Sequence, residues 1–244
     1  MISESGSGSK SERESHSEWV RAAARNNAEW CDAVCREHGL RGELGAGVWS
    51  SHSRTPPLYP DAVTLTPDVS AADLVARIDT ASPGCSVKDS FGCLDLEPLG
   101  FEVLFEAWWI RREAGTRAGE HPGWEPLKSA ESLPAWETAW NDGDESTGLF
   151  RPGLLSEDTK FLAAYAEGRI VAGAVASRAA SVVGVSNLFT SGDEESAWAG
   201  CLAEVARLWP GLPVVGYESG ASLDAAVSQG FTPIGPLKVW LHTG

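Results

Sequence analysis

The chain has 244 residues, 43% of them hydrophobic, which is enough for one large domain or two small ones with an apolar core. Its formal net charge of −15 excludes the basic surface that binds nucleic acid or anionic lipid. The sequence contains no run of eighteen apolar residues, so we expect no membrane span. The N-terminus shows no apolar stretch behind a basic one, so we predict no secretory signal and expect a cytoplasmic protein.

The acidity has two interpretations, because it favours solubility and it also attracts a cationic substrate such as an amine. The cysteines number five and accompany no secretory signal, so a disulfide framework is not expected. Cys31 and Cys35 share one face of a predicted helix, but no further ligands stand at a suitable spacing for a metal. We therefore expect buried thiols and no metal site.

Residues 1–16 consist of Ser, Gly and charged side chains, and we predict that they form a disordered tail. Apolar residues at helical spacing predict a helix from Ser17 to His38, which Gly39 ends. Alternation, capping residues and proline positions then predict strands at 48–51, 61–67 and 85–91, a helix at 70–81, a short helical segment at 94–101 and a strand at 102–112.

A polar, glycine-containing stretch separates this first part from the second, and we place the linker at residues 116–122. Beyond it the sequence predicts a helix at 132–140, three strands within 161–191 with a tight turn at 167–169, a helix at 193–210, a strand at 213–219, a short helix at 222–231 and a strand at 236–242. The order is that of a mixed α/β unit with an antiparallel front and a crossover behind.

Two segments of the chain echo one another, one starting at Cys85 and the other at Leu212. Each runs strand, loop, Leu-Asp, short helix, Gly-Phe and a strand with tryptophan. The matched pairs are Leu94 with Leu223, Asp95 with Asp224, Gly100 with Gly230, Phe101 with Phe231 and, approximately, Trp109 with Trp240. In both copies the glycine suits a left-handed turn after the short helix. An internal repeat and a chance similarity both remain open.

The second part resembles the GNAT superfamily of acyl-CoA-dependent N-acyltransferases. The likeness covers roughly residues 123–242 and rests on the strand-to-helix segment from Val182 to Ala206, the strand PVVGYES and the short helix with its Gly-Phe. Residues 61–112 are similar to the back half of the same fold. The resemblance implies an α/β (mixed α+β) protein of two GNAT-like units in tandem, each a mixed sheet flanked by helices. The first, incomplete unit would span 17–115 and the second 123–244.

The resemblance further implies transfer of an acyl group from coenzyme A, as acetyl-CoA or another acyl-CoA, to a small amine. In such folds the fourth strand diverges from the fifth, and its exposed backbone pairs with the pantetheine arm. The residues that match this strand are Ser186, Asn187, Leu188 and Phe189. The pyrophosphate is held by a glycine-rich loop at the start of the next helix, to which Ser191 and Gly192 correspond.

The sequence departs from the family pattern at two points. The loop keeps one glycine and continues with three carboxylates, Asp193 to Glu195, which favour the helix dipole but repel a pyrophosphate. The tyrosine that often protonates the departing thiolate is replaced by Ala226 in the second unit and by Leu96 in the first.

The candidate catalytic residues are accordingly Glu218 as a general base, Tyr217 as an orienting group together with Asn187, and Ser228 as a hydroxyl donor. For each of them a surface or structural role stands as the alternative. The leading functional hypothesis is an acyltransferase that acts on a small amine. The alternative is a degenerate, non-catalytic GNAT-like protein that binds a ligand or a protein partner.

Overall fold

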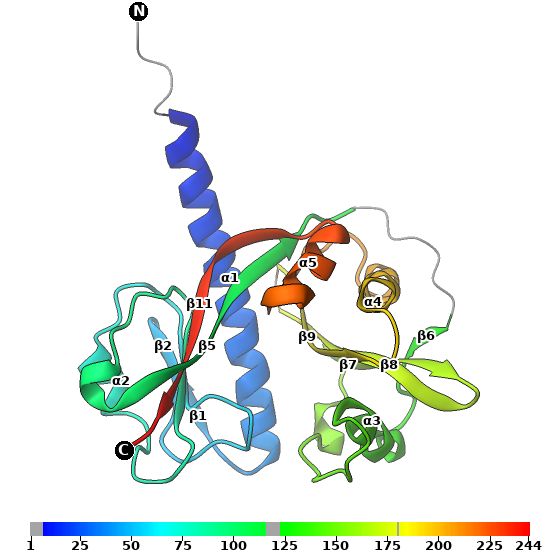
Figure 1. The fold of residues 1–244 in the computed structure, drawn as a ribbon, viewed down its shortest axis with the longest axis horizontal. Coiled ribbons are helices and arrows are strands. Elements are labelled where there is room, and N and C mark those ends of the chain that lie inside the picture. Colours follow the sequence, from blue (N-terminus) through cyan, green and yellow to red (C-terminus); the bar gives the residue numbers. More distant parts are fainter. Residues whose placement is uncertain (1–6, 116–122, 180) are drawn as a thin grey trace, which may run out of the picture.

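A single eleven-stranded mixed sheet organises the computed structural model, which describes residues 7–115, 123–179 and 181–244 (Figure 1). In spatial order the strands run β1-β2-β3-β4-β11-β5-β10-β9-β8-β7-β6. Their bounds are β1 Gly42–Leu44, β2 Val48–Ser51, β3 Ala62–Thr64, β4 Ser86–Asp89, β5 Phe101–Arg112, β6 Trp124–Pro126, β7 Thr159–Ala166, β8 Arg169–Arg178, β9 Val183–Thr190, β10 Val214–Glu218 and β11 Thr232–His242.

The helices and short 3₁₀ turns connect these strands and cover both faces of the sheet (Figure 1). The α-helices are α1 Ser7–Glu37, α2 Ala71–Val75, α3 Leu133–Trp140, α4 Glu194–Leu208 and α5 Gly220–Ser228, and the 3₁₀ turns are η1 Glu97–Leu99, η2 Ala130–Ser132 and η3 Pro152–Leu154. The mixed α/β architecture predicted from the sequence is confirmed. No described helix has the length and apolar character needed to cross a membrane.

Two helices differ from their predicted extents. The helix expected from Ser17 begins at Ser7, so residues 7–16 of the predicted disordered tail are helical. Once a helix is nucleated, each added residue contributes a hydrogen bond without a new nucleation cost, which explains this extension. Conversely, the helix expected over 70–81 ends at Val75. Its last turn tightens to i−3 hydrogen bonds, and the Asp79 carboxylate accepts the backbone N–H groups of Ala81 and Ser82.

The long central strands β5 and β11 are exchanged between the two halves of the chain. They pair antiparallel with each other from Phe101 opposite His242 to Arg111 opposite Thr232. On its outer edge β11 pairs with β4 of the first half, and β5 pairs with β10 of the second half. The predicted units 17–115 and 123–244 therefore contribute to one continuous sheet. In that sheet β11, the last strand of the second unit, extends the strands of the first, and β5, the last strand of the first unit, extends those of the second. The predicted linker 116–122 lies outside the described residues.

The same local hydrogen-bond pattern precedes both exchanged strands. Gly100 and Gly230 have φ angles of 83° and 88°, and each follows a short helical turn. The Phe101 N–H donates to the Leu96 carbonyl, and the Phe231 N–H donates to the Ala226 carbonyl. These are the 6→1 bonds of a Schellman stop, in which the left-handed residue is most easily a glycine. The predicted equivalence of the two segments thus extends to their backbone geometry.

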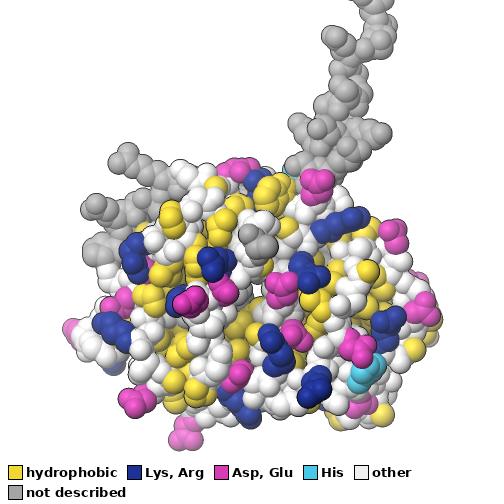
Figure 2. Space-filling view, turned by 180° about the vertical axis from the view of Figure 1, so that it is seen from behind, with side chains coloured by type: hydrophobic (Ala, Val, Ile, Leu, Met, Phe, Trp, Pro, Cys, Tyr) yellow, Lys and Arg dark blue, Asp and Glu magenta, His cyan; other side chains and the backbone are white. Residues whose placement is uncertain are grey.

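Helix α1 packs behind the junction of the two halves and ties them together (Figure 1). Its Asp32 accepts a hydrogen bond from the Trp49 indole of β2, at 3.0 Å, and its Asn26 donates to the Ser177 carbonyl of β8, at 2.9 Å. The buried cluster around Val34 and Trp30 includes side chains from both halves. On this side of the molecule acidic and basic side chains are interspersed among apolar ones (Figure 2).

The cysteines are free thiols, and four of the five are buried. Burial raises the pKa of Cys31 to about 11 and that of Cys35 to about 12. Among the described residues no group of three or more His, Cys, Asp or Glu side chains is arranged to hold a metal ion. The four buried thiols pack as small apolar groups, as the sequence predicts, whereas Cys93 is exposed and departs from that prediction.

We predict that Gly230→Ala lowers the free energy of unfolding by about 1–2 kcal/mol, because a Cβ disfavours the left-handed conformation. Gly192→Ala is the matched control, since Gly192 is not among the residues with positive φ and a Cβ there meets only Thr190 Oγ1, at 3.7 Å. Urea denaturation of both variants measures the difference. Equal stabilities would contradict the assigned role of Gly230.

Candidate functional site

Strands β9 and β10 are parallel neighbours that pair over only two positions, Val183 with Val214 and Gly184 with Val215. At the next position their backbones still approach closely, since a Cβ on Gly216 would lie 3.0 Å from the Val185 carbonyl oxygen. Beyond it, the described ladder of β9 continues with β8 alone, up to Thr190 opposite Ala172. The far half of β9 therefore presents a backbone edge that β10 does not cover.

A β-bulge marks the point at which β9 turns away. Between Ser186 and Phe189 the strand contains one residue more than its partner β8, which spans only Val175 to Gly173. Asn187 within this bulge has a φ of 54°, a left-handed conformation that Asn tolerates better than most residues. The sequence predicts Asn187 as a contact, through its backbone and its side chain, but does not predict the bulge. The available signal was an Asn inside a strand otherwise rich in β-branched and apolar residues.

The four residues predicted to line the pantetheine arm occupy this diverging half of β9, and all are half-buried. Phe189 packs edge-to-face on the Trp136 ring of α3, with ring centroids 5.2 Å apart. Leu188 packs against the cluster on the α4 side of the sheet. The side chains of Leu188 and Phe189 thus hold the strand in place, while β10 leaves the backbone edge of Ser186 to Phe189 unpaired.

The first half contains a similar parallel pair, β3 with β4, but its end is closed. These strands pair at Ala62 with Val87 and at Val63 with Lys88. The Ser90 N–H then donates to Thr64 Oγ1, at 2.8 Å, and so bridges the two strand ends. The helix that follows β3 has five residues, against fifteen in α4 after β9. The open strand edge is therefore a property of the second half.

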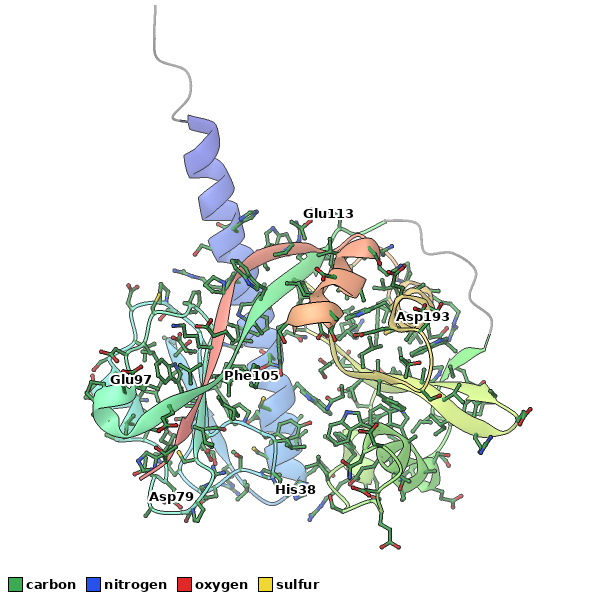
Figure 3. All side chains as sticks on the ribbon, viewed as in Figure 1. His38, Asp79, Glu97, Phe105, Glu113 and Asp193 are labelled. Carbon is green, nitrogen blue, oxygen red and sulfur yellow. The ribbon has the colours of Figure 1, made fainter. Side chains whose placement is uncertain are left out.

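In the loop between β9 and α4, a carboxylate of the chain itself occupies the place at the start of α4 where an anion would bind. Asp193 is the N-cap of α4, and its carboxylate accepts the Ser196 N–H at 2.7 Å (Figure 3). Hydrogen bonding to the Ser196 side chain, followed by this bond to the Ser196 backbone, lowers the pKa of Asp193 below its usual value and keeps the side chain charged. The Gly192 N–H donates to Thr190 Oγ1, and the Ser191 N–H and hydroxyl both donate to the Val171 carbonyl. The predicted phosphate contacts Ser191 and Gly192 thus have internal partners.

Glu218 ends β10, next to the diverging edge of β9, and is half-buried. Burial, reinforced by repulsion from Glu194 at the start of α4, raises the pKa of Glu218 to about 7. A carboxylate with a pKa near neutrality exchanges protons readily at physiological pH. Of the three predicted catalytic residues, Glu218 is the one whose surroundings alter its acid–base chemistry in this way.

Tyr217 and Ser228 lie apart from Glu218. As its neighbour on β10, Tyr217 points to the opposite face of the sheet, where its ring lies edge-to-face on Trp109 at 5.5 Å and its hydroxyl accepts from Lys88 at 3.2 Å. Ser228 is the last residue of α5, and its hydroxyl donates to the Ala225 carbonyl at 2.7 Å. Glu218 precedes the other end of that helix, so the structure does not bring the three residues together.

The comparison with solved structures identifies the architecture. A GCN5-related N-acetyltransferase from Kribbella flavida is similar with a TM-score of 0.63 and 17% identity, over 91% of this chain and 96% of that one. The chain has the GNAT fold. A putative GNAT-family acetyltransferase from Novosphingobium aromaticivorans gives a TM-score of 0.59 and 15% identity, over 88% and 96% of the two chains. A functionally unknown conserved protein from Staphylococcus epidermidis gives 0.53 and 12%, over 80% and 84%. No protein-family model and no curated protein matches the chain.

Within the GNAT fold, the diverging pair β9 and β10 corresponds to the strands that the sequence analysis assigned to the acyl-CoA arm. The structure adds the bulge at Asn187 and the raised pKa of Glu218. It also places Ala226, the position expected to carry a tyrosine, fully buried in α5 beneath the turn that leads into β11. The predicted site therefore contains a carboxyl group with a raised pKa and has no tyrosine on α5.

We predict that Glu218→Gln stabilises the protein at pH 8 by on the order of 1–3 kcal/mol and has little effect at pH 4. The folded-state pKa of about 7 lies above the usual value of 4.5, so this carboxyl stabilises the fold most below pH 4.5 and loses that stabilisation as the pH rises through 7. Urea denaturation at both pH values measures the effect. A Glu218→Gln variant less stable than the wild type at pH 8 would show that the pKa is not raised.

Proposed function

We propose that this protein transfers an acyl group from coenzyme A to an amine, with the second half as the catalytic unit and the first half as its tandem, cofactor-free partner. The observation that carries the proposal is the uncovered edge of β9 at the Asn187 bulge, beside a carboxyl group whose pKa is about 7. The GNAT fold supports it but does not by itself fix an activity.

In the proposed complex the pantetheine arm pairs with the β9 backbone from Ser186 to Phe189 as an added strand. In this proposal the left-handed turn at Asn187, with its φ of 54°, directs backbone amides of the bulge toward the bound thioester. There they would hydrogen-bond the thioester carbonyl and stabilise the negative charge that develops on its oxygen. Acetyl-CoA and longer acyl-CoAs share these contacts, so the acyl group is not specified by them.

Transfer requires that the amine lose a proton and that the thiolate leave. Glu218 accepts a proton from the bound ammonium, directly or through water, and the free amine nitrogen attacks the thioester carbonyl carbon. The new C–N bond forms, the nitrogen releases its second proton to solvent, the C–S bond breaks, and coenzyme A departs as a thiolate that takes up a proton from solvent. A thiol has a pKa near 8.5, so its thiolate is a tolerable leaving group without a tyrosine at position 226.

The acidic start of α4 supports a second candidate function, that of a non-catalytic ligand-binding protein. The Asp193 carboxylate occupies the helix N-terminus where a pyrophosphate would bind, and Glu194 and Glu195 add charge of the same sign. Like charges about 4 Å apart repel by about 4 kcal/mol at an effective dielectric constant of 20. Acyl-CoA binding therefore decides between the two functions.

We predict that Asp193→Asn binds acetyl-CoA several-fold to about tenfold more tightly than the wild type in isothermal titration calorimetry, because Asn keeps the cap and removes the charge. Gly192→Glu is expected to weaken the binding. Asp144→Asn, an exposed aspartate in the turn after α3, is the control for net charge alone. Absence of binding of acetyl-CoA and of longer acyl-CoAs, by wild type and Asp193→Asn alike, would overturn the acyltransferase proposal and favour the non-catalytic function.

We predict that Glu218→Gln lowers kcat by about 10²- to 10⁴-fold and removes the rise in rate around pH 7. The wild-type rate rises through pH 7 because Glu218 must be ionised to accept the proton. Glu194→Gln is the companion variant, and it should move this rise to lower pH because one repelling charge is lost. A Glu218→Gln enzyme with the wild-type pH profile would exclude Glu218 as the base.

A further inference from the structure

A cavity of about 530 Å³ lies over the part of the sheet where strands of both halves meet, on the face to which Tyr217 points. Its floor comes from β4, β11, β5 and β10, and its outer wall is the segment between β2 and β3. It is therefore a different site from the β9 edge and from Glu218, which faces the other side of β10. The cavity is large enough for a small organic molecule.

The wall of this cavity is mostly apolar and accessible. Leu58 and Leu104 line it and are 79% and 55% exposed, and Phe105, at the middle of β5, is 40% exposed (Figure 3). Leu58 holds a left-handed conformation with a φ of 70°, which is uncommon for a residue of its type. Large apolar side chains left exposed around a concave surface are typical of a binding site for an apolar group.

Among the described residues that line the cavity, the charged side chains are two basic ones, Arg54 and Lys88. Arg54 is neutralised by an ion pair with the buried Asp61 and also donates to the carbonyls of Pro83 and Gly84. Lys88 is 5% exposed and has no carboxylate partner in the described part of the chain. In a protein with a net charge of −15, this cavity thus contains an uncompensated positive charge.

The contacts of Lys88 leave it able to bind one more acceptor. Its Nζ donates to Asn27 Oδ1 at 2.8 Å and to the Tyr217 hydroxyl at 3.2 Å, and it lies 4.3 Å from the centre of the Tyr217 ring. An ammonium group has three N–H donors, so one remains. The nearby Cys31 supplies no negative charge at neutral pH, since burial raises the pKa of its thiol to about 11.

A second buried donor lies in the same lining. The Tyr59 hydroxyl is buried. The Tyr59 ring packs edge-to-face on the Trp30 ring, with the two ring centroids 6.3 Å apart. The Trp30 indole can only donate, so the Tyr59 O–H finds no acceptor among the described residues. Burial raises the pKa of Tyr59 well above its usual value and keeps this proton in place. Unsatisfied buried donors of this kind cost stability until an acceptor arrives.

We propose that this cavity binds a small apolar carboxylate, whose charged group pairs with Lys88 at the inner end and whose apolar body lies against Leu58, Leu104 and Phe105. A carboxylate supplies the negative charge that Lys88 has no partner for, an acceptor for its third N–H, and an acceptor for the Tyr59 O–H. An ammonium-bearing ligand would instead be repelled by Lys88. The proposal concerns binding alone and does not depend on the acyl transfer proposed above.

The test measures binding of 4-phenylbutyrate to the full chain by isothermal titration calorimetry, without any acyl-CoA. 4-Phenylbutanamide, which has the same shape and no charge, is expected to bind at least about tenfold more weakly. Lys88→Met should reduce phenylbutyrate binding to the level of the amide, because Met keeps the volume of the side chain and removes the charge. Lys160→Met, a change of the same type on β7, is the control and should bind as the wild type does.

Leu104→Glu tests the same cavity from its wall and is independent of any folding defect in Lys88→Met, since Leu104 is exposed and we expect the fold to accept its replacement. This variant should also abolish phenylbutyrate binding, because the carboxylate introduced in the cavity wall repels the carboxylate of the ligand. Circular dichroism and thermal unfolding confirm that each variant is folded. Equal binding of the acid and the amide, unchanged binding by folded Lys88→Met, or no binding of phenylbutyrate at millimolar concentration would each overturn the proposal.

Discussion

The pairing of β5 with β11 is the constraint on which the rest of the structure depends. Each strand ends one half of the chain, yet each completes the sheet of the other half. Along this seam β5 and β11 share ladder hydrogen bonds, and Ala107, Trp109 and Leu237 are buried. Neither half is therefore a closed unit by itself. Helix α1 reinforces the seam from behind, because its polar contacts reach β2 on one side and β8 on the other.

This exchange also determines what the second half can present to a ligand. Because β5 occupies the outer edge of β10, β10 is held firmly on one side and is free to diverge from β9 on the other. The bulge at Asn187 and the close approach at Gly216 set the point of divergence. Asn26 of α1 fills the space where a side chain at residue 184 would lie, so the closed end of the diverging pair is sealed on that face.

Electrostatics separates the two sides of β10. On the α4 side Glu218 and Glu194 stand close together, and their repulsion helps to keep one proton on Glu218 up to neutral pH. On the α1 side Lys88 is buried among neutral groups, next to Tyr217. Adjacent residues of one short strand therefore face an acidic site on one side of the sheet and a basic cavity on the other. A strand whose side chains alternate between two faces makes this separation possible.

The sequence by itself determined most of the elements, though not β1, β6 or the full extents of α1 and α2, since hydrophobic periodicity and the glycine stops are local properties of the chain. It predicted the mixed α/β class, the strand carrying Asn187, the carboxylates that cap α4, and Glu218 as an acid–base candidate. The tertiary structure alone decided how these elements meet. Strand exchange depends on contacts between residues more than a hundred positions apart, as between Phe101 and His242, which no local pattern encodes. The pKa of Glu218 and the burial of Lys88 likewise arise from neighbours that only folding brings together.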